Sequence, residues 1–300
     1  MRRQHFGAAL AAGALLVLSP VLTQSSFAQA ARGAPRQAAN AKDENRPIPR
    51  LPDGHVSFEA PPGEKGVWNR QDYRPFIPTT IEETALRDRN GNNNDGPPGL
   101  KPKASEVPFQ PWARSLFLYR QTHEIEPYGR CKPAGGFRNM ATPYGTEFVQ
   151  VPEQERMYIF QTGGPHSFRP IYMDGRVHPK DSDPSYYGHS VGRWENDTLV
   201  VDTVGINERG WIDAYGTPTT KQLHLVEKWT RLDFKTLRYE ITIDDPGAYT
   251  APFTTGMLMT YQPGREMFEF VCQDGNLGGE LMIGGDGVNK KIDRSSPIVP

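Results

Sequence analysis

From residue 144 to residue 275, hydrophobic and polar residues alternate in short runs separated by turn residues. A period of two places successive side chains on opposite faces of a β-strand, so each run predicts a half-buried strand. Asn196-Asp197 separates two runs by two turn residues, which is typical of a β-hairpin. The predicted strands cover residues 147–151, 157–162, 168–174, 189–195, 198–204, 222–232, 236–244, 253–261 and 267–272.

Strands of this number and spacing, joined mostly by hairpin-length connections, favour an up-and-down antiparallel sheet. A sheet of eight or nine strands in about 125 residues removes its exposed edges by closing on itself. We therefore expect a mainly β fold, a lipocalin-like antiparallel barrel over residues 144–275, with a β-sandwich as the alternative. A barrel of about eight strands leaves a lumen that side chains fill or that holds one small ligand.

The alternation also assigns side chains to the two faces of the sheet. In the strand at 236–244, the apolar residues, Tyr239 among them, share one face and should point inward. In the strand at 222–232, Glu227 and Arg231 share the inward face with Trp229. A buried charge is costly unless it is paired. Glu227 is therefore expected to be half of an interior ion pair or part of a site.

The residues before the strands are rich in proline and lack long periodic runs. Thr80-Ile81-Glu82-Glu83 has the Thr-x-x-Glu spacing of a capping box and predicts a short helix. Pro111-Trp112 predicts a second helix, with Trp112, Leu116 and Tyr119 on one apolar face. This part is expected to be an extension that wraps the barrel. Prolines and glycines number 28 and 30, which disfavours long helices throughout the chain.

The first residues have the features of a cleavable export signal. Arg2-Arg3 precedes an apolar run at 6–22, and Ala28-Gln29-Ala30 offers a small-x-small cleavage site. The Sec and twin-arginine routes both remain open. The expected organisation is a signal peptide at 1–30, a flexible lead at 31–50, the extension at 51–143, the barrel at 144–275 and a C-terminal tail at 276–300.

Export places the mature chain in the periplasm or outside the cell, where thiols are oxidised. The two cysteines, Cys131 and Cys272, are therefore expected to form a disulfide. Lys and Arg number 34 against 35 Asp and Glu, so the chain lacks the cationic surplus of a nucleic-acid-binding protein. Once the signal is cleaved, no membrane-spanning segment is expected.

The segment 166–195 is the richest in reactive side chains. It combines imidazoles, carboxylates and guanidiniums, which acid–base catalysis needs for proton transfer, orientation of the base and charge stabilisation. We expect these groups to meet at one rim of the barrel. The candidate catalytic residues are His166, Asp174, Arg176, His178, His189 and Arg193.

Aromatic side chains on the inner faces of strands would give flat apolar walls for a small organic ligand, aromatic or polyphenol-like. The candidate ligand-binding residues are Tyr172, Tyr187, Trp194, Glu227, Trp229, Tyr239 and Phe253. The leading hypothesis is an exported barrel that binds such a ligand, with cofactor-free isomerase, lyase or hydrolase chemistry as an addition. Whether the protein is an enzyme, and its oligomeric state, stay open.

Two other functions fit the same sequence. A carbohydrate-active enzyme or sugar-binding domain would use a pair of acids across a groove and exposed aromatic rings. Its candidate acids are Glu195, Asp202, Asp213 and Glu227, and its candidate aromatic residues are Trp194, Trp211 and Tyr187. A non-catalytic envelope interaction protein would instead contact a partner through the proline-rich half. No metal or cofactor is expected, because the histidines lack zinc-ligand spacing.

Four long segments resemble a family of exported bacterial proteins of uncharacterised function. These segments are IYMDGRVHP at 171–179, GHSVGRWENDTLVVDTVG at 188–205, LHLVEKWTRLD at 223–233 and YEITIDDPGAYTAPF at 239–253. The resemblance covers roughly residues 105–275, and it implies export but assigns no activity and no catalytic residue. The likeness to lipocalins is one of strand rhythm, which supports a fold and no function.

Overall fold

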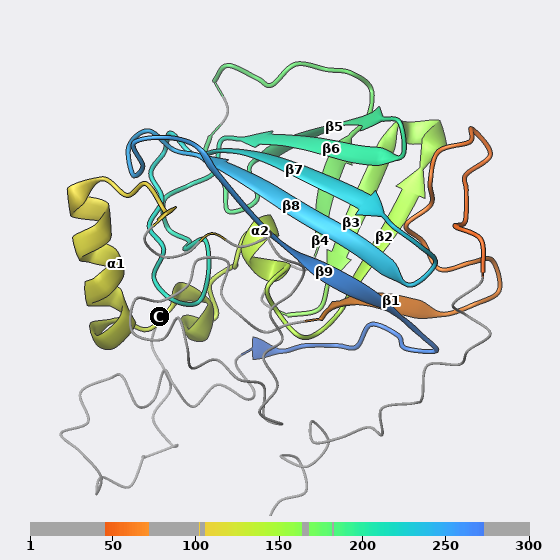
Figure 1. Ribbon diagram of the computed structural model, residues 1–300, viewed down its shortest axis with the longest axis horizontal. Coiled ribbons are helices and arrows are strands. Elements are labelled where there is room, and N and C mark those ends of the chain that lie inside the picture. The colour runs from red at the N-terminus through yellow and green to blue at the C-terminus, as the bar shows by residue number, and fades with distance from the viewer. Residues whose placement is uncertain (1–45, 72–101, 103–105, 164–167, 182, 273–300) are drawn as a thin grey trace, which may run out of the picture. The chain divides into compact units, whose positions relative to one another are not determined.

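The computed structural model describes residues 46–71, 102, 106–163, 168–181 and 183–272. Within them the chain forms one closed β-barrel of nine strands that follow one another around the barrel in sequence order (Figure 1). This closure confirms the predicted mainly β barrel and excludes the sandwich. The predicted signal peptide, the helix expected near Thr80, His166 and the tail at 276–300 lie outside the described residues.

The elements have the following bounds. The strands are β1 Gly66–Arg70, β2 Thr146–Val151, β3 Arg156–Gln161, β4 Phe168–Tyr172, β5 His189–Glu195, β6 Thr198–Val204, β7 His224–Arg231, β8 Thr236–Asp244 and β9 Phe253–Pro263. The helices are α1 Pro111–His123 and α2 Gly136–Asn139, with the 3-10 turns η3 Pro127–Arg130 and η4 Pro152–Gln154.

One neighbouring pair, β4 and β5, is parallel, and the other eight are antiparallel. A closed ring with an odd number of strands in sequence order cannot alternate direction throughout, so at least one pair must be parallel. The expectation of an all-antiparallel barrel is therefore wrong at this pair. The connection at 173–188 returns the chain to the start of β5, and Figure 1 shows it arching beyond β5.

The barrel closes with a different strand from the one predicted. Residues 267–272 form no strand, and β9 instead pairs along the full length of β1. All five residues of β1 are buried, so the strand lacks the alternation of buried and exposed positions from which the other strands were predicted. The segment that was expected to wrap the barrel therefore contributes one of its strands, β1.

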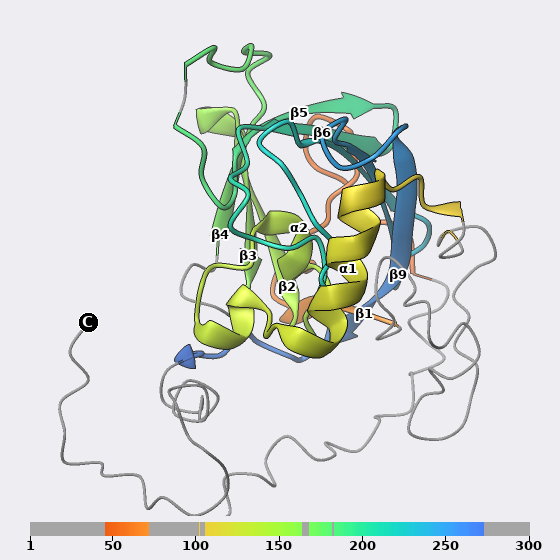
Figure 2. The same cartoon turned by 90° about the vertical axis from the view of Figure 1, so that its left-hand side faces the viewer.

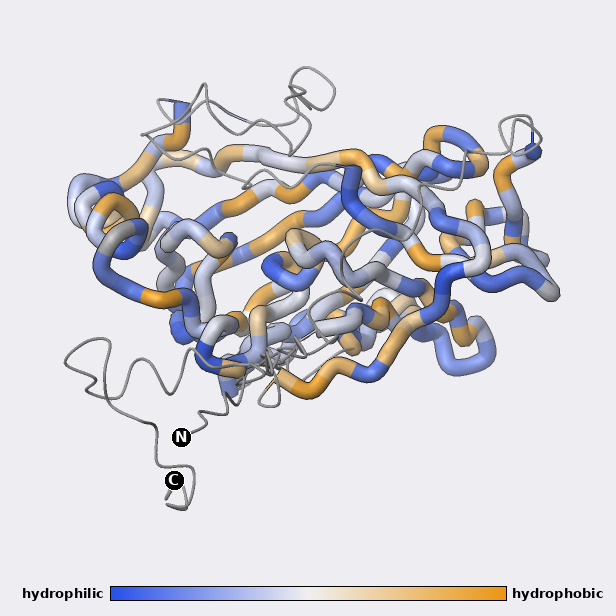
Figure 3. The backbone as a smooth tube through the Cα atoms, turned by 90° about the horizontal axis from the view of Figure 1, so that it is seen from below, coloured by the Kyte–Doolittle hydropathy of each residue, from blue (hydrophilic) through white to orange (hydrophobic). Residues whose placement is uncertain are grey.

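The predicted inward-facing residues of β7 and β8 are confirmed. In β8, Leu237, Tyr239 and Ile241 are buried and alternate with partly exposed residues, and β7 follows the same rule. Figure 3 shows the matching alternation of hydrophobic and hydrophilic residues along the strands. The inward side chains join one continuous hydrophobic core.

Both ends of the barrel are covered. At one end lie α1 and the fully buried turn α2, in front of the barrel in Figure 2. At the other end, residues 46–60 cross the strand turns, where Arg50 pairs with Asp197 at 2.7 Å and the Arg231 Nη1 donates to the Ser57 carbonyl at 2.5 Å. The core is therefore shielded along the barrel axis as well as by its wall.

Helix α1 begins at Pro111, as predicted, but its apolar face is different. Ala113 and Phe117 are the buried residues, while Trp112 and Tyr119 are about half exposed. The Trp112 indole also donates to the Gly247 carbonyl at 3.0 Å, a partner that the helix period does not reveal.

The predicted disulfide between Cys131 and Cys272 is present, with the two Cα atoms 5.6 Å apart. It joins the residue after η3 to the segment that follows β9. A disulfide is compatible with export, because reducing compartments disfavour it.

Among the described residues, no helix has both the length and the apolar character that a membrane crossing requires.

Candidate functional site

The interior charge predicted at Glu227 is half of an ion pair, and its partner is Arg169 of β4. The two guanidinium nitrogens donate to the two carboxylate oxygens at 2.7 and 3.1 Å, and both side chains are at most 2% exposed. The Tyr239 hydroxyl donates to Glu227 at 2.8 Å, and burial raises the pKa of that hydroxyl well above its usual value. These three hydrogen bonds satisfy a carboxylate that would otherwise be costly to bury.

Aromatic rings pack directly against this pair. The ring centroids of Trp229 and Tyr239 lie 4.1 Å apart, and both residues are fully buried. The predicted ligand-binding residues of β7 and β8 therefore contact one another in the core. These rings do not contact His178, His189 or His224, because those histidines lie on the opposite face of the barrel wall.

The reactive cluster lies on the outer face of β5, β6 and β7. His178 and His189 approach each other through their Nδ1 atoms at 2.8 Å, and the His178 Nε2 lies 2.8 Å from an Asp202 carboxylate oxygen. The His224 Nε2 contacts the other oxygen of Asp202 at 3.0 Å. We call these four residues the histidine–carboxylate cluster. Their side chains remain partly accessible, at 24% for His178, 30% for Asp202 and 36% for His224.

Strand alternation explains why these residues meet outside. Ser190, Thr203 and Leu225 are buried, so their neighbours in sequence, His189, Asp202 and His224, point outward. The three strands are consecutive in the barrel wall.

His178 reaches the same face from the connection between β4 and β5, which has to cross the outside of the wall to join two parallel strands. The parallel pair thus creates the site.

When His178 and His189 are both neutral, their hydrogen bonds assign the proton positions of the two rings. A carboxylate only accepts, so neutral His178 carries its proton on Nε2 and donates it to Asp202. The His178 Nδ1 then has a lone pair and accepts the Nδ1 proton of His189. Neutral His189 in turn keeps its lone pair on Nε2, and no described residue hydrogen-bonds that atom. The arrangement presents a free basic nitrogen at the end of a hydrogen-bonded chain.

Tyr172, at the end of β4, connects this chain to two arginines. Its ring stacks on His189 with centroids 5.0 Å apart, and the Arg176 guanidinium lies 3.9 Å from the ring centroid. Arg176 also donates to Asp174 at 2.5–2.9 Å, and this hydrogen bonding lowers the pKa of Asp174 to about 2. The Arg156 guanidinium lies 5.3 Å from the same ring.

The pKa of His189 is lowered. The main cause is burial, and the positive charges that His178 and Arg176 can carry act in the same direction. His189 therefore stays neutral, and able to accept a proton, at a lower pH than an exposed histidine.

The structure thus brings together five of the predicted residues, Tyr172, Asp174, Arg176, His178 and His189. Other predicted site residues lie elsewhere, in separate contacts. Arg193 pairs with Glu195 at 2.6 Å on the exposed surface, and Trp194 stacks on His55. Tyr187 is buried with its hydroxyl accepting from Asn139, and Phe253 packs on Tyr249.

The sequence pattern does not link Asp202 and His224 to this cluster. By alternation alone His224 is a residue of the polar face of its strand, and Asp202 is a candidate only under the carbohydrate hypothesis. The signal that could have found them is their outward position on strands next to β5, since β6 follows β5 through the predicted hairpin. Recognising His224 also required the pairing of β6 with β7.

The cluster does not have the geometry of a metal site. Both ring nitrogens of His178 face side-chain partners, so they do not point toward a common centre. Across the described ranges, no set of three or more His, Cys, Asp or Glu side chains is placed to hold a metal ion.

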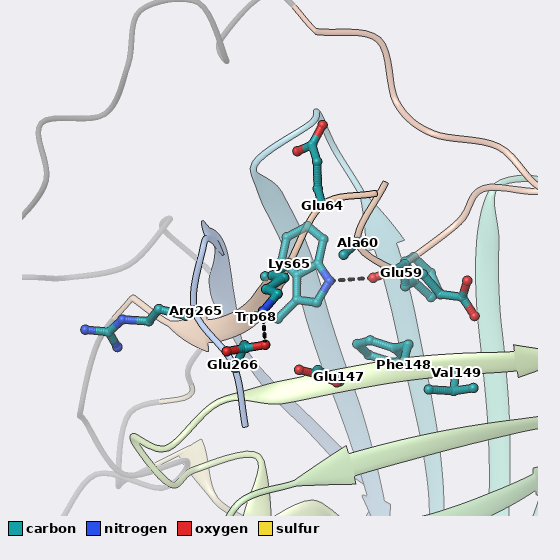
Figure 4. Close-up of a pocket in the computed structure, with 12 residues that line it drawn as sticks. Glu59, Ala60, Glu64, Lys65, Trp68, Glu147, Phe148, Val149, Arg265 and Glu266 are labelled. Atoms are coloured by element: carbon teal, nitrogen blue, oxygen red, sulfur yellow. Dashed lines mark hydrogen bonds and ion pairs between the residues drawn. The ribbon is translucent and has the colours of Figure 1, made fainter. Parts of the chain in front are cut away.

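A separate pocket of about 360 Å³ lies beside β1 and β2, where these strands pair at one position (Figure 4). Trp68 and Phe148 form its apolar wall, yet they are only 1% and 3% exposed. Among its charged residues, Lys65 and Glu266 pair with each other at 2.6 Å. It offers little free apolar surface, so the histidine–carboxylate cluster is the stronger candidate.

No protein-family model, curated protein or solved structure matches the chain. The fold and the cluster by themselves define a closed β-barrel with a histidine–carboxylate hydrogen-bond chain on its outer face.

Proposed function

We propose that this chain is an exported protein that binds a small organic molecule on the outer face of its barrel and exchanges a proton with it. His189 is the general base, and His178 and Asp202 are positioning residues that act through it. The observation that carries this proposal is the continuous chain from the Asp202 carboxylate through His178 to His189.

The chain of hydrogen bonds supports a balanced proton transfer. The His189 Nε2 takes a proton from a C–H or O–H group of the bound molecule, whose electron pair stays on the molecule. The Nδ1 proton of His189 then moves toward the His178 Nδ1, which places the positive charge beside Asp202. The return of the proton to a different atom of the molecule completes an isomerisation, and loss of a leaving group completes an elimination.

The surroundings of His189 supply the other elements of such a site. Tyr172 offers a ring beside the base, and Arg176 offers a cation that can stabilise negative charge developing on the bound molecule. These features support an aromatic or otherwise flat ligand. Export is supported by the disulfide and by the expected signal peptide.

The carbohydrate hypothesis finds less support. Its four candidate acids have different partners, and Asp202 and Glu227 point to opposite sides of the barrel wall. Asp213 is buried and accepts from Thr217 at 2.9 Å. The aromatic residues expected to be exposed for a sugar, Trp211 and Tyr187, are also buried.

A deuterium-exchange experiment tests the proposal and does not require the ligand to be identified first. The purified protein is incubated in D₂O with a small-molecule extract of cells that export it, and the molecules are measured by mass spectrometry. We expect at least one compound to gain deuterium or change in mass with the wild-type protein, and this change to fall at least tenfold with His189→Gln.

The control is His123→Gln, which replaces an exposed histidine of α1. It should leave the exchange unchanged. The proposal fails if no compound changes with the wild-type protein, or if the His189 and His123 variants behave alike.

A further inference from the structure

Apolar side chains cover the outer face of β2, β3 and β4, the three strands that precede the His189 strand β5 around the barrel. Cross-strand pairing sets Tyr158 between Val149 and Pro170, and Phe160 beside Phe168. The centroids of the Tyr158, Phe160 and Phe168 rings lie 6.1–6.5 Å apart. We call this surface the aromatic band, which consists of Val149, Tyr158, Phe160, Phe168, Pro170 and Tyr172.

The aromatic band is accessible and continuous with the proposed site. Val149 is 38% exposed and Phe168 41%, although valine and phenylalanine are usually buried. Tyr172 ends the band and stacks on His189. From Phe168 to Tyr172 the strand advances by about 13 Å, at ~3.3 Å for each residue.

The two ends of the band differ in charge. Arg156 pairs across the strands with Tyr172 at the His189 end, and it forms no ion pair with any described residue. Glu147 pairs with Phe160 at the far end. A ligand with one negative group would be attracted to the Arg156 end and repelled from the Glu147 end.

We propose that the aromatic band binds a planar aromatic molecule with one anionic group, whose anion lies beside Arg156 and His189 and whose rings cover Phe168 and Tyr158. The inference rests on the proposed function for the fate of this molecule, but the binding itself requires only the band and Arg156. The molecule is therefore an aryl carboxylate or a similar aromatic acid. Its anionic group sits next to the nitrogen that we assign as the base.

Titration with 2-naphthoate tests this inference, followed by isothermal calorimetry and by the histidine signals in NMR spectra. 2-Naphthamide serves as the neutral analogue of the same shape. We expect naphthoate to bind at least tenfold more tightly than naphthamide and to raise the pKa of His189, because a nearby anion stabilises the protonated imidazole.

Variants separate the contributions of charge and ring. Arg156→Gln should remove the preference for naphthoate over naphthamide. Arg156→Lys keeps the positive charge and should keep part of that preference, so it shows whether the effect of Arg156→Gln comes from the charge or from a loss of fold. Phe168→Ala should weaken both compounds. Arg193→Gln is the matched control, because this exposed arginine also lies on the outer face but outside the band.

Equal binding of the two compounds overturns the inference, as does an equal effect of the Arg156 and Arg193 variants. Retained binding of naphthoate to His189→Gln supports it. In that case a failure of the deuterium exchange would contradict the proposed proton transfer but not the proposed binding of aromatic acids.

Discussion

Glu227 of β7 is a charged residue buried in the barrel interior. Its carboxylate is fully buried and accepts two hydrogen bonds from Arg169 and one from Tyr239. Removing it leaves a buried guanidinium without its counter-charge, which costs far more than losing a surface pair.

Glu227→Ala is therefore expected to lower the free energy of unfolding by about 3–5 kcal/mol. Urea denaturation at neutral pH measures this change. The control is Glu195→Ala, which breaks the exposed pair with Arg193 and should cost less than about 1 kcal/mol. Similar losses in the two variants would mean that the interior pair adds no more than a surface contact.

The lowered pKa of His189 predicts how stability depends on pH. The unfolded chain takes up the proton near pH 6.5, the ordinary value for histidine, while the folded chain takes it up at a lower pH. The unfolded state thus binds more protons in this window. The contribution of neutral His189 is complete above about pH 6.5 and is lost as the pH falls toward the folded value.

We expect the stability of the wild-type protein to fall more steeply than that of His189→Gln as the pH is lowered below about 6.5. Denaturation curves at several pH values give the two slopes. A His189→Gln slope equal to that of the wild-type protein would contradict the lowered pKa.

At the scale of elements, the strands with regular alternation and short turns were predictable. β5, β6 and β8 begin and end at the predicted residues, because each has one polar and one apolar face. β1 was missed, since its five residues are all buried and its pairing with β9 spans most of the chain. Local pattern contains no information about such distant pairing.

The same limit explains which part of the site was found. His178 and His189 lie within one short segment, so their proximity in sequence suggested a cluster. Asp202 and His224 join only through the order of strands in the barrel, and Arg169 meets Glu227 across the interior. The cluster lies near one end of β5, β6 and β7, on the outer face of the wall. The alternation in His189–Glu195 predicts which residues share a face, but it does not by itself say which face points outward.

Gly256 of β9 lies opposite Glu240 of β8. A Cβ atom at this position would lie 2.3 Å from the carbonyl oxygen of Tyr239, which belongs to the backbone and cannot rotate away. Gly256→Ala should therefore lower the free energy of unfolding by about 1–3 kcal/mol or more. Thermal or urea denaturation measures it.

Gly210→Ala is the matched control, because its added Cβ would meet nothing closer than 3.7 Å and its φ is not positive. Its stability should stay near that of the wild-type protein. A Gly256→Ala protein of wild-type stability would show that the two strands can separate at this point without cost.

At the scale of the whole molecule, the barrel serves as a scaffold more than as a container. Large side chains in the barrel interior join one hydrophobic core. Helices α1 and α2 lie over one end of the barrel (Figure 2), and residues 46–60 contact the strand turns at the other. The histidine–carboxylate cluster and the aromatic band lie on the outer face of the barrel, and His178 comes from the connection between the parallel strands β4 and β5. The filled core and the buried Arg169–Glu227 pair thus form a rigid wall on which an outer site can be held in place.

The disulfide acts on the whole chain, because it closes a loop between residues 141 apart. In the chain-entropy model a loop of this length stabilises the folded state by about 4–5 kcal/mol, by restricting the unfolded chain.

Cys131→Ala combined with Cys272→Ala should lower the free energy of unfolding by up to this amount. The bond lies outside the barrel strands, so far-UV circular dichroism should change little. The wild-type protein with its disulfide reduced is the control, and its denaturation midpoint should coincide with that of the double variant. A double variant as stable as the oxidised protein would mean that the link constrains nothing the barrel needs.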